Sequence, residues 1–122
     1  MAVIQPTVTD PQGDGSTKLV KWAALANTDT GAPFMMPAFS QMSMQVTGTI
    51  GTGGKVQLKG SQTGTTYAQL PNKQGTAIEL SALGFAQSDC GAAYVRPEIT
   101  AGDGTTALTV EILFTRVTPL RT

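Results

Sequence analysis

Residues 41–51 read QMSMQVTGTIG, a stretch whose side chains change character at almost every step. The apolar side chains fall on alternate positions: Met42, Met44, Val46 and Ile50. The positions between them carry Gln, Ser or Thr. A period of two is typical of a β-strand that buries one face and exposes the other. This stretch therefore predicts a half-buried strand.

The same alternation extends outward from this stretch in both directions along the chain. It is clear over residues 55–59, 93–99 and 106–115, and weaker over residues 17–25, 66–70 and 76–80. Leu113 interrupts the pattern in the last strand. Pro97 cannot donate a ladder hydrogen bond, so we expect its strand to be an edge strand or to carry a bulge.

Glycine-rich turns separate these runs at short spacing, as in Gly51-Thr52-Gly53-Gly54 and Gly102-Asp103-Gly104. No stretch has a convincing helical period, and residues 81–85 fit at most one short turn. Short strands between tight turns predict an all-β fold, either an antiparallel β-sandwich or a jelly-roll-like barrel.

The chain of 122 residues is long enough for one domain and too short for two. Residues 1–15 are expected to form an extended N-terminal arm, because Pro6 and Pro11 break any regular ladder. This arm would be an edge strand or would reach a neighbouring molecule. Residues 16–122 are expected to form the single β-sandwich domain.

Charged residues make up only 13 % of the chain, against about 25 % in ordinary soluble domains. The net charge is zero and no basic stripe is present, so we expect no nucleic-acid binding. No apolar run approaches the roughly 20 residues that span a bilayer, so we expect no membrane partner. The first ten residues lack the features of a secretion signal, which favours synthesis and assembly in the cytoplasm of a host cell.

The sequence offers little chemistry for an active site. It has no histidine, and its one cysteine, Cys90, has no histidine to activate it. The eight carboxylates are scattered among turns and outward strand positions. We therefore expect no catalytic residues, no cofactor and no metal ion. The Gly-Asp-Gly sequences at 13–15 and 102–104 fit hairpin turns, with calcium binding as the alternative interpretation.

The aromatic side chains are few, so a sugar-binding surface is only an alternative. Trp22 alternates with Val20 and is expected in the core, whereas Tyr94 is expected on the polar face of its strand beside Arg96. The most apolar and least regular segment is 32–40, which would be either a loop packed over one end of the sandwich or a contact patch. The candidate interface residues are Val3, Ile4, Val8, Phe34, Met35, Met36 and Phe39.

A pattern of short motifs runs through roughly residues 18 to 115. It comprises Val20-Lys21-Trp22, Asp29-Thr30-Gly31-Ala32-Pro33, Val46-Thr47-Gly48-Thr49-Ile50-Gly51, Val56-Gln57-Leu58-Lys59-Gly60-Ser61, Gly64-Thr65-Thr66-Tyr67, Tyr94-Val95-Arg96-Pro97 and Gly102-Asp103-Gly104-Thr105-Thr106, before the strand 108–113. This pattern resembles small structural proteins encoded in the head gene clusters of tailed bacteriophages. In that group an acidic or Asn-Gly turn often precedes the central aromatic, whereas this chain has Gln62-Thr63-Gly64 before Tyr67. The resemblance implies a β-sandwich virion component and does not separate head from tail.

Together these features predict a non-enzymatic decoration or cement protein on the capsid exterior. Its partner would be the major capsid protein, with homo-oligomer or lattice-neighbour contacts between copies. A tail or fibre module, with glycan binding as an added activity, is the first alternative. An accessory domain of an enzyme is the second. A neutral surface favours association of this kind over a monomeric existence.

Overall fold

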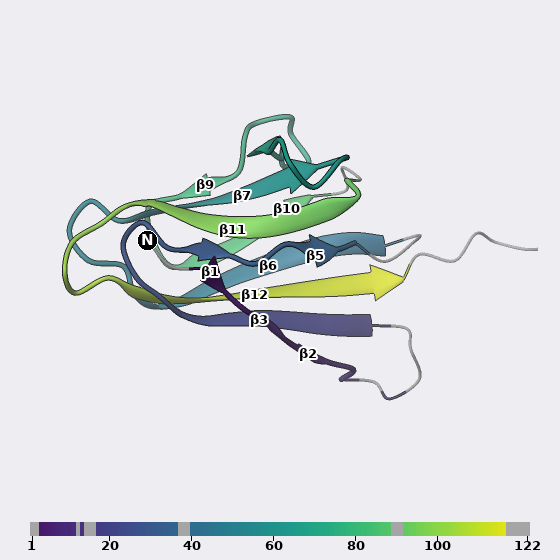
Figure 1. The fold of residues 1–122 in the computed structure, drawn as a ribbon, viewed down its shortest axis with the longest axis horizontal. Coiled ribbons are helices and arrows are strands. Elements are labelled where there is room, and N and C mark those ends of the chain that lie inside the picture. The colour runs from purple at the N-terminus through teal and green to yellow at the C-terminus, as the bar shows by residue number, and fades with distance from the viewer. Residues whose placement is uncertain (1–2, 12, 14–16, 37–39, 89–91, 117–122) are drawn as a thin grey trace, which may run out of the picture.

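The computed structural model describes residues 3–11, 13, 17–36, 40–88 and 92–116 as two β-sheets packed face to face (Figure 1). The larger sheet contains β1 (Val3–Ile4), β4 (Thr30–Gly31), β5 (Phe34–Met35), β7 (Lys55–Ser61), β8 (Ala68–Gln69), β9 (Glu79–Leu80) and β11 (Tyr94–Ala101). The smaller sheet contains β2 (Thr7–Thr9), β3 (Thr17–Leu25), β6 (Ser40–Thr49), β10 (Gly84–Ser88) and β12 (Ala107–Arg116). The predicted sandwich is confirmed, and no closed barrel forms in the described part of the chain.

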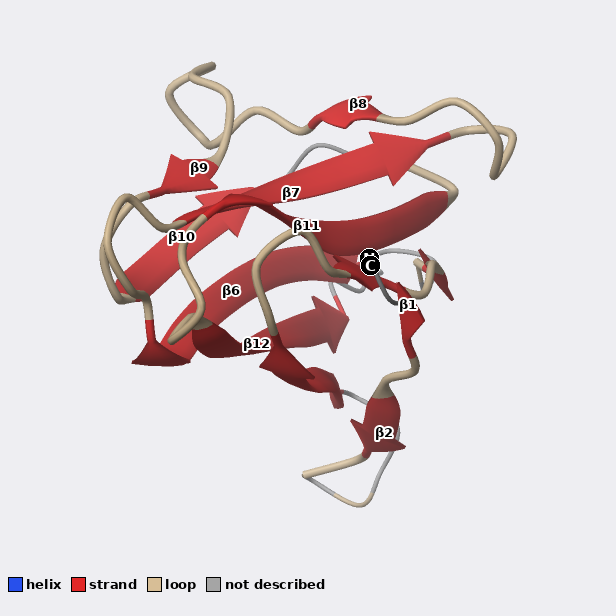
Figure 2. Cartoon of the chain, turned by 60° about the vertical axis from the view of Figure 1, so that its left-hand side comes forward, coloured by secondary structure: helices blue, strands red, loops and turns tan. Residues whose placement is uncertain are grey.

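The order of strands places different segments on the two open sides of the sandwich. The smaller sheet runs β10-β6-β12-β3-β2, and the larger runs β1-β4-β11-β7-β8, with β5 beside β11 and β9 beside β7. All pairs are antiparallel except β1 with β4. Figure 2 shows the two layers, with β7, β8 and β9 in one and β6 and β12 in the other. The N-terminal strands therefore lie on one side, and β8, β9 and β10 lie on the opposite side.

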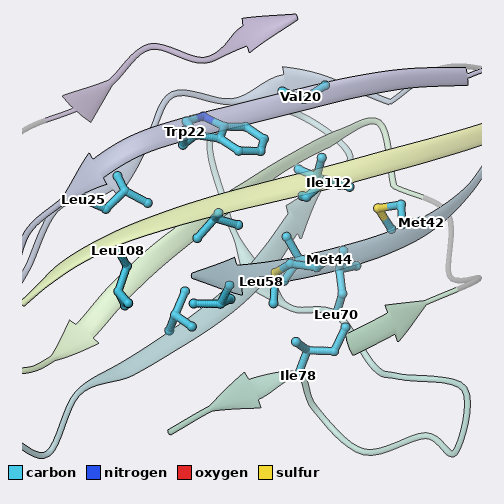
Figure 3. Packing of buried hydrophobic residues seen from close by; sticks show 14 of the residues in the cluster. Val20, Trp22, Leu25, Met42, Met44, Leu58, Leu70, Ile78, Leu108 and Ile112 are labelled. Carbon is cyan, nitrogen blue, oxygen red and sulfur yellow. The ribbon is translucent and has the colours of Figure 1, made fainter. Parts of the chain in front are cut away.

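The predicted alternation determines which side chains enter the core. The strands β6, β7, β11 and β12 each bury every second residue between the sheets. Figure 3 shows several of these residues packed together with side chains of β3. The core comprises Val20, Trp22, Leu25, Met42, Met44, Val46, Val56, Leu58, Leu70, Ile78, Val95, Ile99, Leu108, Val110, Ile112 and Phe114. Burying a side chain of this size stabilises the fold by about 1.5–3 kcal/mol, so this cluster is the main stabilising element.

Pro97 lies in a strand that has neighbours on both sides, so the prediction of an edge strand is wrong. The alternative prediction, a bulge in this strand, agrees with the irregular pairing of β11. β11 pairs with β7 along one side, with a register shift between Ile99 and Ala101. On its other side it pairs with β5 at Tyr94 and Val95, and with β4 at Glu98. Because the Ile99 amide points to that side, toward the carbonyl of Asp29, the nitrogen of Pro97 faces it too. Pro97 therefore lacks its N–H group at a position between β5 and β4, where β11 has no strand to pair with on that side.

A bulge in β3 changes which residues of that strand are buried. Val110 pairs with Trp22 but Leu108 pairs with Leu25, so one extra residue of β3 lies opposite Thr109. Ala24 adopts a φ of 59° at this point. Simple alternation would bury Ala24 and expose Leu25, whereas the extra residue reverses the faces and buries Leu25 completely. The bulge thus brings a large apolar side chain into the core.

Three connections that cross between the sheets meet at one end of the sandwich, on the left in Figure 1. They are residues 26–29 after β3, 50–54 after β6 and 102–106 after β11. Asn27 Nδ2 donates to the carbonyl of Gly102 at 3.2 Å, and Thr106 Oγ1 donates to the carbonyl of Ile50 at 2.9 Å. These side-chain hydrogen bonds join connections that are far apart in the sequence.

The carboxylate of Asp103 accepts several hydrogen bonds within this group of loops. Thr105 Oγ1 donates to its Oδ1 at 2.6 Å and the Thr105 amide does so at 2.9 Å. The Thr52 amide, from the neighbouring connection, donates to Oδ2 at 2.9 Å. The hydroxyl of Thr105, then the amides of Thr52 and Thr105, stabilise the ionised form and hold the pKa of Asp103 well below its ordinary value. The charged carboxylate is therefore part of the folded connection.

The bulge leads to a prediction about the two alanines within it. Ala24→Gly should leave the free energy of unfolding unchanged or raise it by up to about 1 kcal/mol, because glycine adopts a positive φ without steric cost. Ala23→Gly, at the adjacent exposed position, should lower it by about 0.5–1 kcal/mol, since glycine only adds backbone freedom there. Urea unfolding of both variants checks this. An equal decrease in the free energy of unfolding in the two variants would show that the backbone at Ala24 is not strained.

Asp103 leads to a prediction about the dependence of stability on pH. Its folded-state pKa is lowered, so its contribution is present above the unfolded pKa of about 3.9 and is lost as the pH falls toward the folded value. Asp103→Asn should therefore lower the melting temperature at pH 7. The difference in melting temperature between the wild type and Asp103→Asn should decrease steadily as the pH falls below about 4. Thermal melting of both proteins from pH 7 to pH 2.5 measures this difference. A difference that does not change with pH would show that the charge of Asp103 does not stabilise the fold.

Candidate protein-binding surfaces

Three of the candidate interface residues expose apolar side chains along one open side of the sandwich. The exposed fractions are 58 % for Val3 on β1, 45 % for Val8 on β2 and 64 % for Met35 on β5. Figure 1 shows these three short strands running along the same side of the molecule. We call Val3, Val8 and Met35 the N-terminal edge. Exposed apolar side chains on one side of a molecule are a common feature of surfaces that bind protein.

The other candidates on that side serve partly to close the core. Ile4, Phe34 and Met36 are half-buried and pack against the core cluster. The ring centroids of Phe34 and Phe114 are 5.5 Å apart. Phe39 lies outside the described residues. The described part of this segment, residues 32–36, therefore covers the core and exposes Met35 to solvent, and its role as a contact patch stays a prediction.

Hydrogen bonds fix this side of the molecule to both sheets. Trp22 Nε1 donates to the carbonyl of Ala32 at 3.0 Å, which satisfies the indole of a fully buried tryptophan. The Ala32 amide donates to the carbonyl of Ile4 at 2.7 Å, and the Met36 amide donates to that of Ala93 at 3.0 Å. The N-terminal edge is thus preformed, so binding a partner there would need little reordering of the backbone.

A second apolar region lies on the opposite open side, around β10. Phe85 is 66 % exposed and Leu83 is 50 % exposed. Beside them is a groove of about 600 Å³ between β10 and residues 72–80. Sequence analysis missed this region, since residues 81–85 were expected to form a turn and 84–88 form a strand. The available signal was Phe85 itself, a large apolar residue in a stretch without helical or turn-forming character.

The outer face of the larger sheet carries a group of paired charges. Glu98 accepts from Lys59 Nζ at 3.2 Å and lies 3.8 Å from Arg96 Nη2. The Arg96 guanidinium carbon lies 3.8 Å above the ring centroid of Tyr67. One face of Tyr67 is therefore occupied by a cation, and Tyr94 is only half-exposed. These two rings do not form the open flat platform on which a sugar ring would stack.

The outer face of the smaller sheet is polar but almost uncharged. Its side chains come mainly from Gln, Ser and Thr residues of β6 and β12, and Leu113 interrupts them as expected. Glu111 and Lys21 occupy one cross-strand row of β12 and β3. The two outer faces thus differ in charge, and the smaller sheet supplies the neutral surface that the composition indicates.

The described carboxylates do not form a cluster that could hold a metal ion. Within the described ranges, no three Asp, Glu, Cys or His side chains lie close enough to hold a metal ion. Both oxygens of Asp103 accept hydrogen bonds from its own and the adjacent turn, so Gly102-Asp103-Gly104 forms a turn. This turn joins the two sheets, so the expectation of a hairpin at this position is wrong. Asp14, Asp89 and Cys90 lie outside the described residues. The described part of the chain contains no helix long and apolar enough to cross a membrane.

Comparison with known proteins identifies the fold. No protein-family model matches the sequence. No curated protein sequence matches it either. Among solved structures, the chain is similar to the crystal structure of the SPBc2 prophage-derived protein YomS, with a TM-score of 0.58 and 17 % identity over 80 % of this chain and 93 % of that one. At this identity the likeness shows a shared fold, a small β-sandwich that accounts for nearly all of the other protein.

Proposed function

We propose that the chain is a bacteriophage virion protein that binds the outside of the capsid as a decoration or cement subunit. The observation that carries the proposal is the fold shared with a prophage-derived protein over most of both chains. The motifs between residues 18 and 115 that resemble phage head proteins support the same class of function. Both indications are independent of the composition, which favours a protein that binds other proteins.

The surface chemistry supports binding to protein rather than catalysis. The N-terminal edge offers Val3, Val8 and Met35 on a backbone that hydrogen bonds hold in place. The chain has zero net charge, so copies do not repel one another when they occupy neighbouring lattice positions. The proposed partner of the N-terminal edge is the major capsid protein.

Stabilisation of the shell would follow from mass action. A protein that binds only the intact lattice stabilises it by about 2.7 kcal/mol per site when its concentration is a hundred times Kd. A capsid repeats each site many times, so modest contacts add up over the whole shell. Bound subunits that contact two capsid proteins oppose their separation, and the shell retains DNA to a higher temperature.

A tail or fibre module remains the second candidate function, because the resemblance covers virion proteins in general. Among the described residues, the most exposed aromatic ring is that of Phe85, which has no hydroxyl to hydrogen-bond a sugar. Binding of the isolated protein to a glycan array would favour this alternative over capsid decoration.

The cement function predicts that adding the protein to undecorated capsids raises the temperature at which DNA is released. The triple variant Val3→Ser, Val8→Ser, Met35→Ser should bind at least about tenfold more weakly, because it removes the apolar side chains of the N-terminal edge. Sedimentation with capsids measures binding, and dye fluorescence during heating measures DNA release. Thr115→Ser, an exposed change on the outer face of the smaller sheet, is the matched control.

Two results would contradict parts of this proposal. If the wild-type protein binds purified tails but no capsids, the cement function is wrong. If the triple variant binds capsids as tightly as the wild type, the function stands but the N-terminal edge is not the contact.

A further inference from the structure

β10 is an edge strand with an unusual lack of protection. It pairs with β6 over all five residues in a continuous register, from Gly84 opposite Val46 to Ser88 opposite Met42. Among the described strands it has no second neighbour. Its sequence, GFAQS, contains no charge and no proline. Natural proteins usually protect edge strands with lysine, proline, a bulge or a very short strand, because unpaired backbone groups attract other strands.

The other edges of the sandwich do show such protection. β2 has three residues and lies between Pro6 and Pro11. The edge strands of the larger sheet, β1, β5, β8 and β9, have two residues each. β10 is therefore the one edge in the described structure that is long enough, regular enough and neutral enough to take an added strand.

The groove beside β10 has a preformed far wall. Residues 71–78, which we call the 71–78 loop, are held by an Asn72 side chain that accepts from the amides of Gln74 and Thr76 at 2.9 and 3.0 Å. Ser88 Oγ donates to the carbonyl of Pro71 at 2.7 Å and ties the loop to the end of β10. The Ile78 amide donates to the carbonyl of Leu70 at 2.9 Å. The groove is thus a fixed feature of the fold.

The lining of the groove indicates the chemistry of its occupant. Apolar contacts are available from Ala77, Leu80 and Phe85, and the volume of about 600 Å³ lies within the range of small binding pockets, about 300–1,000 Å³. The charged lining residues are Lys73 and Glu79, and Glu79 already contacts Gln57 Nε2 at 2.6 Å and Lys55 Nζ at 3.9 Å. The other polar lining residues are Ser43, Asn72, Gln74, Thr76 and Gln87, so an uncharged extended segment that presents both polar and apolar side chains fits this lining.

The volume of the groove favours a single strand over a second copy of the sandwich. Residues of the 71–78 loop and of β10 both line this space of about 600 Å³. An added copy would bring its own β10 followed by its β6, so it would need room for two strands beside β10. A lone extended segment needs room for one strand and still pairs with the backbone of β10.

We propose that the groove binds an extended, uncharged segment of a neighbouring capsid subunit by strand addition to β10. This inference rests on the proposed function for the identity of the partner. β10 and the N-terminal edge lie on opposite sides of the sandwich. One decoration subunit thereby holds two capsid subunits, one at each side, and acts as a bridge between them.

The test compares substitutions on β10 with a matched change elsewhere on the same sheet face. Phe85→Lys and Gln87→Lys place a charge on exposed positions of the edge strand, and Thr115→Lys places the same charge on the interior strand β12. Circular dichroism first confirms that all three variants fold. The two β10 variants should bind undecorated capsids on the order of tenfold more weakly, and Thr115→Lys should bind as the wild type does.

Amide hydrogen exchange supplies a readout of backbone pairing itself. In wild-type protein bound to capsids, amides of β10 should exchange more slowly than in the free protein, because an added strand protects them. Wild-type protein that binds capsids with unchanged β10 exchange and unimpaired β10 variants would overturn strand addition while leaving the cement function intact. Wild-type protein that binds no capsid would overturn both. Dimers in solution that Phe85→Lys dissociates would assign the edge to a second copy instead.

Discussion

The structure depends on one constraint, the burial of two apolar sheet faces against each other. Trp22 shows how closely the sheets meet, since its side chain is fully buried and its indole donates to Ala32 of the opposite layer. A Cβ atom at Gly31 would lie 2.6 Å from Pro97 Cδ and 2.7 Å from Trp22 Cδ1. Only glycine fits between these rings. Two irregular features of the fold lie close to this contact, because the bulge at Ala24 follows Trp22 in β3 and Pro97 lies within β11.

The long strands could be predicted from the sequence because their burial follows a period of two. The core positions Val56, Leu58, Val110, Ile112 and Phe114 obey it without exception. The short strands could not be predicted, because a two-residue ladder such as β8 or β9 depends on its neighbour and leaves no periodic signal. The burial of Leu25 could not be predicted for a different reason. A bulge in β3 reverses the inner and outer faces of the strand, so alternation alone places Leu25 on the outer face.

The candidate binding surfaces could also be predicted only in part. The apolar segment near residue 34 was identifiable from composition, but only the structure separates Met35, which faces solvent, from Phe34, which packs against Phe114. The groove beside β10 had no counterpart in the sequence analysis. Its lining comes from residues 72–80, from residues 85–87 and from Ser43 on β6, and no sequence pattern indicates that these segments meet. A strand with its largest side chain facing outward also resembles a loop in sequence. Recognising such a surface requires knowledge of which strand ends the sheet.

The two open sides of the sandwich differ in how much backbone they offer for hydrogen bonding to a partner. This difference bears on how a decoration subunit would work. On the side of the N-terminal edge, the terminal strands β1 and β2 are only two and three residues long, so a partner meets mainly side chains such as Met35. On the opposite side, β10 offers its own backbone to a partner, so binding there adds directional hydrogen bonds to apolar contact. Side-chain contacts tolerate small shifts between lattice positions, whereas strand pairing fixes register. A subunit with one contact of each kind would hold one neighbour firmly and still adapt to the spacing of the next.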